Sequence, residues 1–372
     1  MNVRFLYILF LAIFLRPSSL TALGHEQVGP LRVGVIGLTH THVHWIFGSE
    51  PRGDFEIVGI VEPNEKLAMS YAQQYGFSMN MVYPTMDELF AEKSVEAVTA
   101  FGTIYEHLEV VEEAAPRGIH VMVEKPLAVN MEHARRMEEL AKKHNIHLLT
   151  NYETTWYPST QKAKALVQED AIGSVRKVMV QDGHKGPKKI GVNQEFLDWL
   201  TDPVQNGGGA EIDFGCYGAN LLTWLMDGER PNSVVAIAQQ LQAENNPKVN
   251  DESIILLQYD STVAVIQGSW NWPIGRKDLE IYGLRGVVYA DNKTDLRVRI
   301  SEGYDGFEEQ KMTLEDLPRP FDDPFSLLTS VVRGTTTLER YDLSSLENNL
   351  LVVEILDAAR KSAESNAAVF LE

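Results

Sequence analysis

Short apolar runs alternate with amphipathic runs along the first part of the chain. Leu31–Leu38 (LRVGVIGL) is apolar and rich in β-branched residues, which is typical of a strand buried in a parallel sheet. Asn64–Gly76 has helical periodicity and ends on a glycine, a normal helix stop. This alternation predicts a doubly wound α/β unit with a parallel sheet. The predicted strands are Leu31–Leu38, Phe55–Glu62, Val95–Phe101, His120–Glu124 and one starting with Ile146–Thr150, and the predicted helices are Asn64–Gly76, one after the capping-box sequence Thr85–Glu88, and Asn130–His144.

The pattern changes after Asn151, where strands follow one another with few helices between them. We therefore expect a C-terminal α+β domain with one large, mostly antiparallel open sheet. The boundaries are then residues 25–150 for the first domain and 151–372 for the second, which ends in a C-terminal helix. The predicted strands are Val175–Gln181, Val234–Gln242, Ser253–Tyr259, Thr262–Gln267, Asp278–Tyr282, Gly286–Ala290 and Leu296–Ser301, and the predicted helices are Glu211–Met226, Phe325–Arg333 and Ser344–Ser362.

Residues 1–24 have the features of a secretory signal peptide. A basic start, Met1–Arg4, precedes the apolar run Phe5–Leu15, and Ala22–Gly24 offers a small-x-small cleavage site. A membrane-spanning helix needs ~20 apolar residues, so this run is too short to span a membrane. We expect a periplasmic or secreted protein without a stable membrane anchor after cleavage, and an uncleaved anchor is the alternative.

Charge and cysteine content narrow the partners and the compartment. The formal net charge is −19, which repels phosphate backbones and argues against a nucleic-acid partner. Cys216 is the only cysteine, so no internal disulfide can form. The stability of an exported chain must then come from its core, which fits a bacterial-type periplasm.

The turn after the first predicted strand is a candidate cofactor site. A strand, a glycine turn and a helix start bind the phosphates of a dinucleotide. Of the G-x-G-x-x-G pattern only Gly37 is kept, because Thr39 and His42 stand at the second and third glycine positions. Glu62 ends the second strand, where it could accept a ribose hydroxyl and favour NAD over NADP, or simply be a solvated carboxylate. The broken glycine motif leaves open that the cofactor has been lost.

The same turn holds three alternating histidines, His40, His42 and His44. Histidines four residues apart on one helix face can hold a metal. No nearby carboxylate or cysteine at ligand spacing completes such a set, so we expect no metal here and keep this trio as the alternative. His40 and His42 are instead expected to face a phosphate or a substrate hydroxyl, with plain packing as the remaining interpretation.

Three further motifs carry a family resemblance. Glu124-Lys125-Pro126 ends the fourth predicted strand, and His107 lies seventeen residues before Glu124. Gly207-Gly208-Gly209 is followed by the segment Asp213–Tyr217 (DFGCY). In this order the motifs resemble those of the glucose–fructose oxidoreductase / inositol dehydrogenase (Gfo/Idh/MocA) family, and the resemblance covers nearly all of the mature chain.

This resemblance implies an N-terminal Rossmann domain, a C-terminal open sheet and an active site between them. It also implies NAD(P)-linked oxidation of a sugar or cyclitol hydroxyl. Carried over, Lys125 lies near the nicotinamide and the reacting hydroxyl, with His107 and Glu124 on the cofactor side. A charged donor there can stabilise the developing alkoxide or relay its proton. The alternative is a lysine that only orders the loop around Pro126.

The family's histidine in D-x-G-x-H is Tyr217 in this chain. A phenol has an unperturbed pKa of ~10, so it is a poor base at neutral pH unless a cation lowers that pKa. Our hypothesis is that Tyr217 and Lys125 form a proton-transfer pair. Asp213 precedes Tyr217 by four residues and should face the same site, where it would hold a substrate hydroxyl or orient the pair. A helix-start carboxylate stabilised by the helix dipole is the alternative.

Aromatic side chains suit a sugar ligand, because their flat faces can stack on a sugar ring. We expect Tyr152 and Trp156, just past the last predicted Rossmann strand, to line the substrate pocket. Each could equally be core, the commoner position of such residues.

These features predict an exported NAD(P)-dependent oxidoreductase that acts on a sugar, glycoside or cyclitol hydroxyl. Free NAD is scarce outside the cytoplasm, so the cofactor should be tightly bound. One alternative is a redox-assisted glycoside hydrolase or lyase of the same fold. Another is a cofactor-free, metal-assisted enzyme or a sugar-binding protein, because one fold hosts many chemistries. The expected partners are a small carbohydrate and, by the family resemblance, further copies of the chain bound through the C-terminal sheet.

Overall fold

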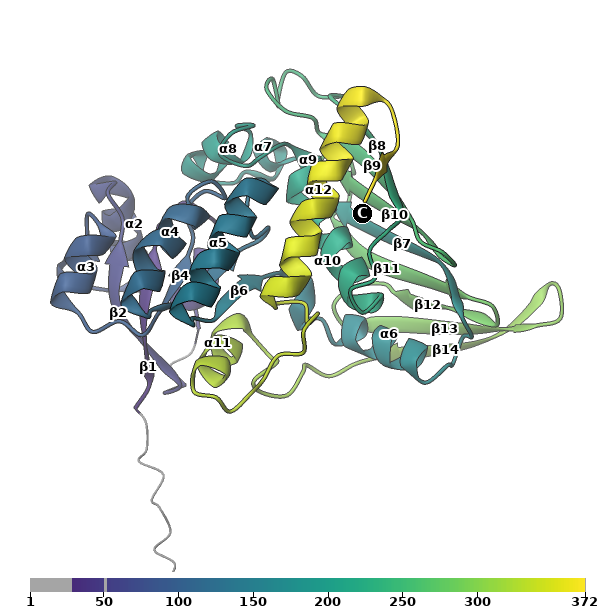
Figure 1. Ribbon diagram of the computed structural model, residues 1–372, viewed down its shortest axis with the longest axis horizontal. Coiled ribbons are helices and arrows are strands. Elements are labelled where there is room, and N and C mark those ends of the chain that lie inside the picture. The colour runs from purple at the N-terminus through teal and green to yellow at the C-terminus, as the bar shows by residue number, and fades with distance from the viewer. Residues whose placement is uncertain (1–28, 50–51, 372) are drawn as a thin grey trace, which may run out of the picture.

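The computed structural model describes residues 29–49 and 52–371 of the chain (Figure 1). The predicted signal peptide, residues 1–24, lies outside the described residues. A six-stranded sheet and a nine-stranded sheet lie side by side, and helix α12 (Leu346–Ser365) runs between them (Figure 1). Among the described residues, no helix is long and apolar enough to cross a membrane.

The first sheet is parallel throughout, with the strand order β3-β2-β1-β4-β5-β6. The predicted doubly wound fold is therefore confirmed. Every predicted strand is present with small shifts at its ends, and the two-residue strand β3 was too short to give a pattern. The strands are β1 Leu31–Ile36, β2 Phe55–Val61, β3 Val82–Tyr83, β4 Ala97–Ala100, β5 His120–Glu124 and β6 Leu148–Asn151.

Side-chain caps set the starts of the helices around this sheet. The side chain of Asn64 accepts the N–H of Leu67 to begin α2, and Gly76 ends this helix with a φ of 76°. Helix α1 after the candidate cofactor turn has only five residues. The helices are α1 Val43–Phe47, α2 Glu65–Tyr75, α3 Met86–Glu92, α4 His107–Ala114 and α5 Met131–His144.

The second sheet has the order β14-β13-β12-β11-β7-β10-β9-β8-β15. Only the pair β7–β10 is parallel among its described neighbours, which confirms the mostly antiparallel prediction. Strand β14 was not predicted, because its side chains are mostly exposed on both faces and give no apolar alternation. The strands are β7 Val175–Gly183, β8 Ser233–Gln239, β9 Glu252–Gln258, β10 Val263–Ser269, β11 Arg276–Gly283, β12 Gly286–Ala290, β13 Asp295–Glu302, β14 Gly306–Thr313 and β15 Val369–Phe370.

Helices cover one face of the second sheet (Figure 1). The predicted single helix Glu211–Met226 is wrong, because the chain breaks at Phe214 into α9 and α10. Gly218 brings α10 close to the sheet, since a Cβ there would lie 2.4 Å from the side chain of Ile266. The remaining helices are α6 Pro158–Gln168, α7 Pro187–Ile190, α8 Gln194–Leu200, α9 Ala210–Asp213, α10 Gly215–Leu225, α11 Pro324–Val332 and α12 Leu346–Ser365.

The C-terminal helices also complete the core of the first unit. Phe325, Leu327 and Leu328 of α11 are buried with Leu31 and other residues of the first sheet. Val353 of α12 belongs to the apolar cluster around β4 and β5. The segment 151–372 therefore builds the second sheet and also covers part of the first.

Candidate active site

A cavity of about 490 Å³ lies at the carboxyl end of the parallel sheet. The turn after β1 and the end of β5 form one side of it, and α8, α9 and the ends of β7 and β11 form the other. Ligands of doubly wound folds bind at this edge of the sheet, so the cavity is the candidate active site. Five of the predicted site residues line it, namely His40, His42, Lys125, Asp213 and Tyr217.

Lys125 and Asp213 form a buried ion pair between the two units. The Nζ of Lys125 donates to Asp213 Oδ1 at 2.5 Å and to the main-chain oxygen of Asp213 at 2.9 Å. That main-chain oxygen lies at the end of α9, where the helix breaks. The indole Nε1 of Trp270 donates to the other carboxylate oxygen at 2.9 Å. The lysine is thus held in a fixed position at the cavity wall by charge-assisted hydrogen bonds.

The two partners keep each other charged. Burial acts to raise the pKa of Asp213, but the Lys125 ammonium outweighs it and lowers this pKa to about 2. Burial acts to lower the pKa of Lys125, and the Asp213 carboxylate outweighs it, so the pKa of Lys125 is raised. At neutral pH Lys125 is therefore an ammonium, which can donate a hydrogen bond but cannot act as a base.

Tyr217 is not paired with Lys125 as we expected. Its hydroxyl accepts a hydrogen bond from the Nζ of Lys277 at 3.3 Å, and the Lys125 ammonium lies 5.3 Å from the centre of its ring. Burial raises the pKa of Tyr217 well above its ordinary value, and nearby carboxylates add to this. The hypothesis that Lys125 lowers the pKa of this phenol is wrong in this structure, because the lysine charge is directed at Asp213.

The structure adds cavity residues that the sequence analysis missed. Lys277 of β11 forms an ion pair with Glu153, which also accepts a hydrogen bond from the hydroxyl of Tyr157 at 2.5 Å. Burial acts to raise the pKa of Glu153, but Lys277 outweighs it and lowers this pKa to about 2. Lys277 lies two residues before the buried Leu279 and therefore on the same face of β11. A charged residue on this apolar strand face was the sequence signal that could have identified Lys277 as a site residue.

Four of the eight predicted cofactor residues, Gly37, Thr39, Glu62 and His107, line a neighbouring cavity of about 290 Å³. Of the other four, His40, His42 and Lys125 line the active-site cavity, and Glu124 lines neither. Gly37 has a φ of 78°, and a Cβ there would lie 2.7 Å from the main-chain nitrogen of Gly102, so the turn requires glycine. Glu62 is buried and not solvated, and its two oxygens accept the N–H groups of Leu38 at 3.0 Å and Asn64 at 2.8 Å. Burial raises the pKa of this carboxyl.

His107 begins α4 and is fully buried at this second cavity. Its Nδ1 lies 3.2 Å from the main-chain oxygen of Leu127, and its Nε2 has no hydrogen-bond partner among the described residues. Burial lowers the pKa of His107 to about 4, so the ring is neutral at physiological pH.

The three histidines of the turn do not lie together. His40 is buried, and its Nδ1 accepts the N–H of His42 at 3.0 Å. The Nδ1 of His42 lies 2.9 Å from the Oε2 of Glu124. His44 points away, where its Nδ1 contacts the hydroxyl of Tyr75 on α2. The alternative metal set of His40, His42 and His44 is therefore wrong, because α1 turns His44 toward a different element.

Tyr152 and Trp156 lie in the core and do not line the cavity. Tyr152 is fully buried, and its ring lies nearly perpendicular to that of Tyr217 with the ring centres 5.5 Å apart. Trp156 donates its Nε1–H to the Oδ1 of Asn151 at 3.0 Å. The expectation that they contact a sugar is not met, because the 3₁₀ turn Glu153–Trp156 directs their neighbours Glu153 and Tyr157 to the cavity instead.

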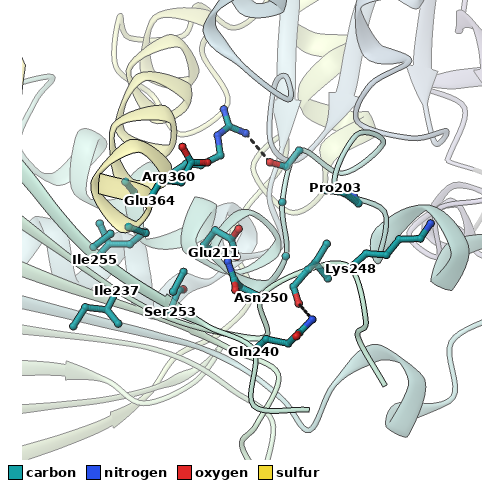
Figure 2. Close-up of a pocket in the computed structure, with 18 of the residues that line it drawn as sticks. Pro203, Glu211, Ile237, Gln240, Lys248, Asn250, Ser253, Ile255, Arg360 and Glu364 are labelled. Carbon is teal, nitrogen blue, oxygen red and sulfur yellow. Dashed lines mark hydrogen bonds between the residues drawn. The ribbon is translucent and has the colours of Figure 1, made fainter. Parts of the chain in front are cut away.

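A further cavity, of about 460 Å³, is lined by residues of α9, β8, β9 and α12 (Figure 2). Glu211 of α9 lines it, while Asp213 of the same helix lines the active-site cavity. The Nη1 of Arg360 donates to the main-chain oxygen of Gly207 at 2.7 Å at its edge (Figure 2). One oxygen of Glu211 has no hydrogen-bond partner among the described residues, and burial raises the pKa of this carboxyl.

The parallel sheet, the lysine at the carboxyl edge of this sheet and the neighbouring cavity lined by predicted cofactor residues are together typical of an oxidoreductase with a dinucleotide-binding domain. Comparison with known proteins gives the same class. The family model described as "Oxidoreductase family, NAD-binding Rossmann fold" matches residues 31–152, and that of the "GFO/IDH/MocA C-terminal domain" matches residues 160–289. The chain belongs to the Gfo/Idh/MocA oxidoreductase family.

Individual relatives are distant. Myo-inositol 2-dehydrogenase of Thermotoga maritima is 24% identical over 346 residues, which are 92% of this chain and 99% of that protein. Trans-1,2-dihydrobenzene-1,2-diol dehydrogenase of Xenopus tropicalis is 25% identical over 241 residues, 64% of this chain and 68% of that protein.

Solved structures share the fold. An inositol dehydrogenase homologue from Azotobacter vinelandii in complex with NAD+ has a TM-score of 0.78 at 18% identity, over 92% of this chain and 98% of that one. An aldose–aldose oxidoreductase from Caulobacter crescentus, in complex with glycerol, has a TM-score of 0.74 at 22% identity, over 92% and 100%.

Proposed function

We propose that the protein is an NAD-dependent dehydrogenase that oxidises a hydroxyl group of a sugar or cyclitol. The Lys125–Asp213 pair carries this proposal, because it fixes an ammonium in the wall of a cavity at the carboxyl edge of an NAD-binding Rossmann domain. The names of the relatives, which include a myo-inositol 2-dehydrogenase, support a polyhydroxylated substrate.

Lys125 would donate a hydrogen bond from its Nζ to the reacting oxygen. As a hydride leaves the carbon, negative charge develops on that oxygen, and a pre-positioned ammonium stabilises it. Asp213 is a positioning residue, because its carboxylate and main-chain oxygens both orient the Nζ. Bound NAD would supply the hydride acceptor.

The residues of the neighbouring cavity fit a dinucleotide. Its wall holds a strand-end carboxylate, Glu62, and the partnerless Nε2 of the buried His107. The main-chain N–H groups of Leu38, His40 and His42 in the turn are already hydrogen-bonded to Glu62, Phe101 and His40, so these three groups do not support phosphate binding, and the fit rests on Glu62 and His107. Glu62 would hold ribose hydroxyls, which favours NAD over NADP. The predicted tight binding of the cofactor is part of this proposal.

Polar side chains on the second side of the active-site cavity suit a ligand with several hydroxyls. Glu153, Lys277, Asp291 and Asn292 line it with both donors and acceptors. The apolar Phe196 of α8 lines the same cavity and offers a face for carbon-bound hydrogens. This mixture is suited to a polyol, in which hydroxyl groups and C–H groups alternate.

We further propose export to the periplasm or the medium, and self-association through the open face of the second sheet. Residues 1–24 support export through their signal-peptide pattern. On the open face, exposed Val235 and Ile237 of β8 pair directly with exposed Leu256 and Ile254 of β9. Exposed apolar side chains that form one patch are typical of an interface. Intact-mass analysis of the exported protein and light scattering test these two points.

The central experiment starts with denaturing the purified mature protein and quantifying released NAD(H) and NADP(H) by mass spectrometry. Sugars and cyclitols are then screened for reduction of bound or added NAD. We expect NAD and a turnover that Lys125→Met lowers by at least about 100-fold, the scale of a lost electrostatic contact in a transition state. Lys248→Met, at an exposed ion pair away from the cavity, is the matched control. Absence of bound NAD together with no uptake of added NAD would reject the proposal.

A further inference from the structure

Three metal-ligating side chains converge beside the active-site cavity. One ring nitrogen each from His40 and His42 and one oxygen of Glu124 all lie within 4.8 Å of one another. Glu124 is separated from His42 by 82 residues along the chain, so the spacing of the turn could not reveal it. The fold joins them because the turn after β1 and the end of β5 meet at the same edge of the parallel sheet.

We propose that His40, His42 and Glu124 bind one divalent transition-metal ion, with zinc as the best chemical match. Two imidazoles and one carboxylate are a ligand set of zinc sites that keep an open position. Bonds of about 2.1 Å place tetrahedral ligand atoms about 3.4 Å apart. The His42 Nδ1 and Glu124 Oε2 are already 2.9 Å apart, so the ion would replace the proton between them. The ring of His40 would turn to bring one nitrogen from within 4.8 Å to about 3.4 Å of the other two ligand atoms, and would release the N–H of His42.

The surroundings hold these donors in place. The Nδ2 of Asn151 donates to the Oε1 of Glu124 at 2.7 Å, and the Nε1 of Trp156 in turn donates to the Asn151 Oδ1. Metal ligands are commonly oriented by such outer hydrogen bonds. The ring of His42 stacks on Trp45 with ring centres 3.9 Å apart. This gives Asn151 and Trp156, both buried, a role that a sugar-stacking interpretation does not provide.

The open coordination position would face the cavity, because His40 and His42 both line it together with Lys125. The ligand for that position is an oxygen of the substrate, a hydroxyl or a carbonyl. The ion and the Lys125 ammonium could then contact the same oxygen from two sides. The metal site itself does not depend on the proposed dehydrogenase function, since its ligands come entirely from the protein.

The test uses the untagged mature protein, stripped with a chelator and then titrated with Zn²⁺ or Co²⁺. Elemental mass spectrometry gives the stoichiometry, and the visible spectrum of bound Co²⁺ reports the number and type of ligands. We expect one ion per chain, with affinity lowered at least about tenfold in His42→Asn and in Glu124→Gln. His44→Gln, in the same turn but facing Tyr75, should bind like the parent. Addition of the polyol selected by the substrate screen should change the Co²⁺ spectrum.

The parent protein alone can overturn the inference, whether or not the variants fold. Less than half an equivalent of metal after titration would reject the site, as would equal binding in the parent, His42→Asn and Glu124→Gln. NAD content is measured in the same preparations. NAD without metal would reject only the metal site, and metal without NAD would reject only the proposed dehydrogenase.

Discussion

Asparagine in place of Asp213 should destabilise the protein strongly, because it leaves the Lys125 ammonium buried without its counter-ion. The side chains of Lys125 and Asp213 are only 6% and 7% exposed. Removal of one partner from a buried pair costs about 3–5 kcal/mol, whereas an exposed pair contributes about 0–1 kcal/mol. Asparagine keeps the shape of the side chain and can still accept the indole N–H of Trp270. The loss of stability therefore measures the contribution of the carboxylate charge.

A double-mutant cycle isolates this contribution. We expect a coupling energy of about 3 kcal/mol between Lys125→Met and Asp213→Asn, from urea unfolding followed by fluorescence and circular dichroism. The cycle of Lys248→Met and Asp202→Asn is the control, because that pair is 64% and 26% exposed and should couple by about 0.5 kcal/mol. Added salt should reduce only the control coupling, since a buried pair is weakly screened.

The reasoning would be refuted by a coupling below about 1 kcal/mol for the buried pair, or by equal salt dependence in the two cycles. The two probes must also give coincident transitions, because only then does one free energy describe unfolding. Separate transitions would mean that the pair does not join the two units into one cooperative structure.

Three further predictions concern single positions. Gly37→Ala should lower the free energy of unfolding by more than about 2 kcal/mol, because a Cβ at this positive φ is strained and also clashes with the backbone. Gly118→Ala is the control, because its φ is also positive but its Cβ would lie in open space, and it should cost about 1 kcal/mol. Equal shifts of the thermal midpoint in the two variants would contradict the clash. Burial raises the folded-state pKa of Glu211, so its contribution to stability is present below its unfolded pKa of ~4.3 and is lost as the pH rises through the folded value. Glu211→Gln should therefore gain stability relative to the parent between pH 4 and pH 8, by about 1.4 kcal/mol per unit of raised pKa, while Glu364→Gln at the exposed rim of the same cavity should show no such gain. Tyr217→Phe should lower kcat/KM about tenfold through one lost hydrogen bond to a charged group, and loss of a limb from the pH profile would instead identify the phenol as the base.

Much of the fold follows from local patterns. The buried parallel strands are continuous apolar runs, and the strands of the second sheet alternate, so both kinds were predictable. Strand β14 was not predictable, because it has no apolar face that would give an alternating pattern. It is held in the sheet by its pairing with β13. The helix break at Phe214 was also not predicted. The main-chain oxygen of Asp213 that the break leaves free accepts a hydrogen bond from Lys125, which is distant in the sequence, so local patterns could not show it.

The site was predictable in its composition but not in its pairing. Lys125, Asp213 and Tyr217 do line one cavity, as the spacing and the family motif suggested. The pairing of each lysine with its partner depends on side-chain directions at the boundary between the two units. There Lys277, and not Lys125 as we expected, donates a hydrogen bond to the hydroxyl of Tyr217. Tyr152 failed as a pocket residue for a similar reason, since one step along a 3₁₀ turn separates the core from the cavity wall.

Because the last helices pack on the first sheet, this sheet is synthesised early but cannot complete its core until the end of the chain has been made. The six strands of that sheet leave the ribosome early, while α11 and the Val353 turn of α12, which bury part of its apolar surface, come last. Until then the nascent Rossmann unit lacks part of its core and exposes apolar surface, which favours aggregation. A stop codon a few dozen residues before the end would therefore disable the beginning of the protein as well as its end.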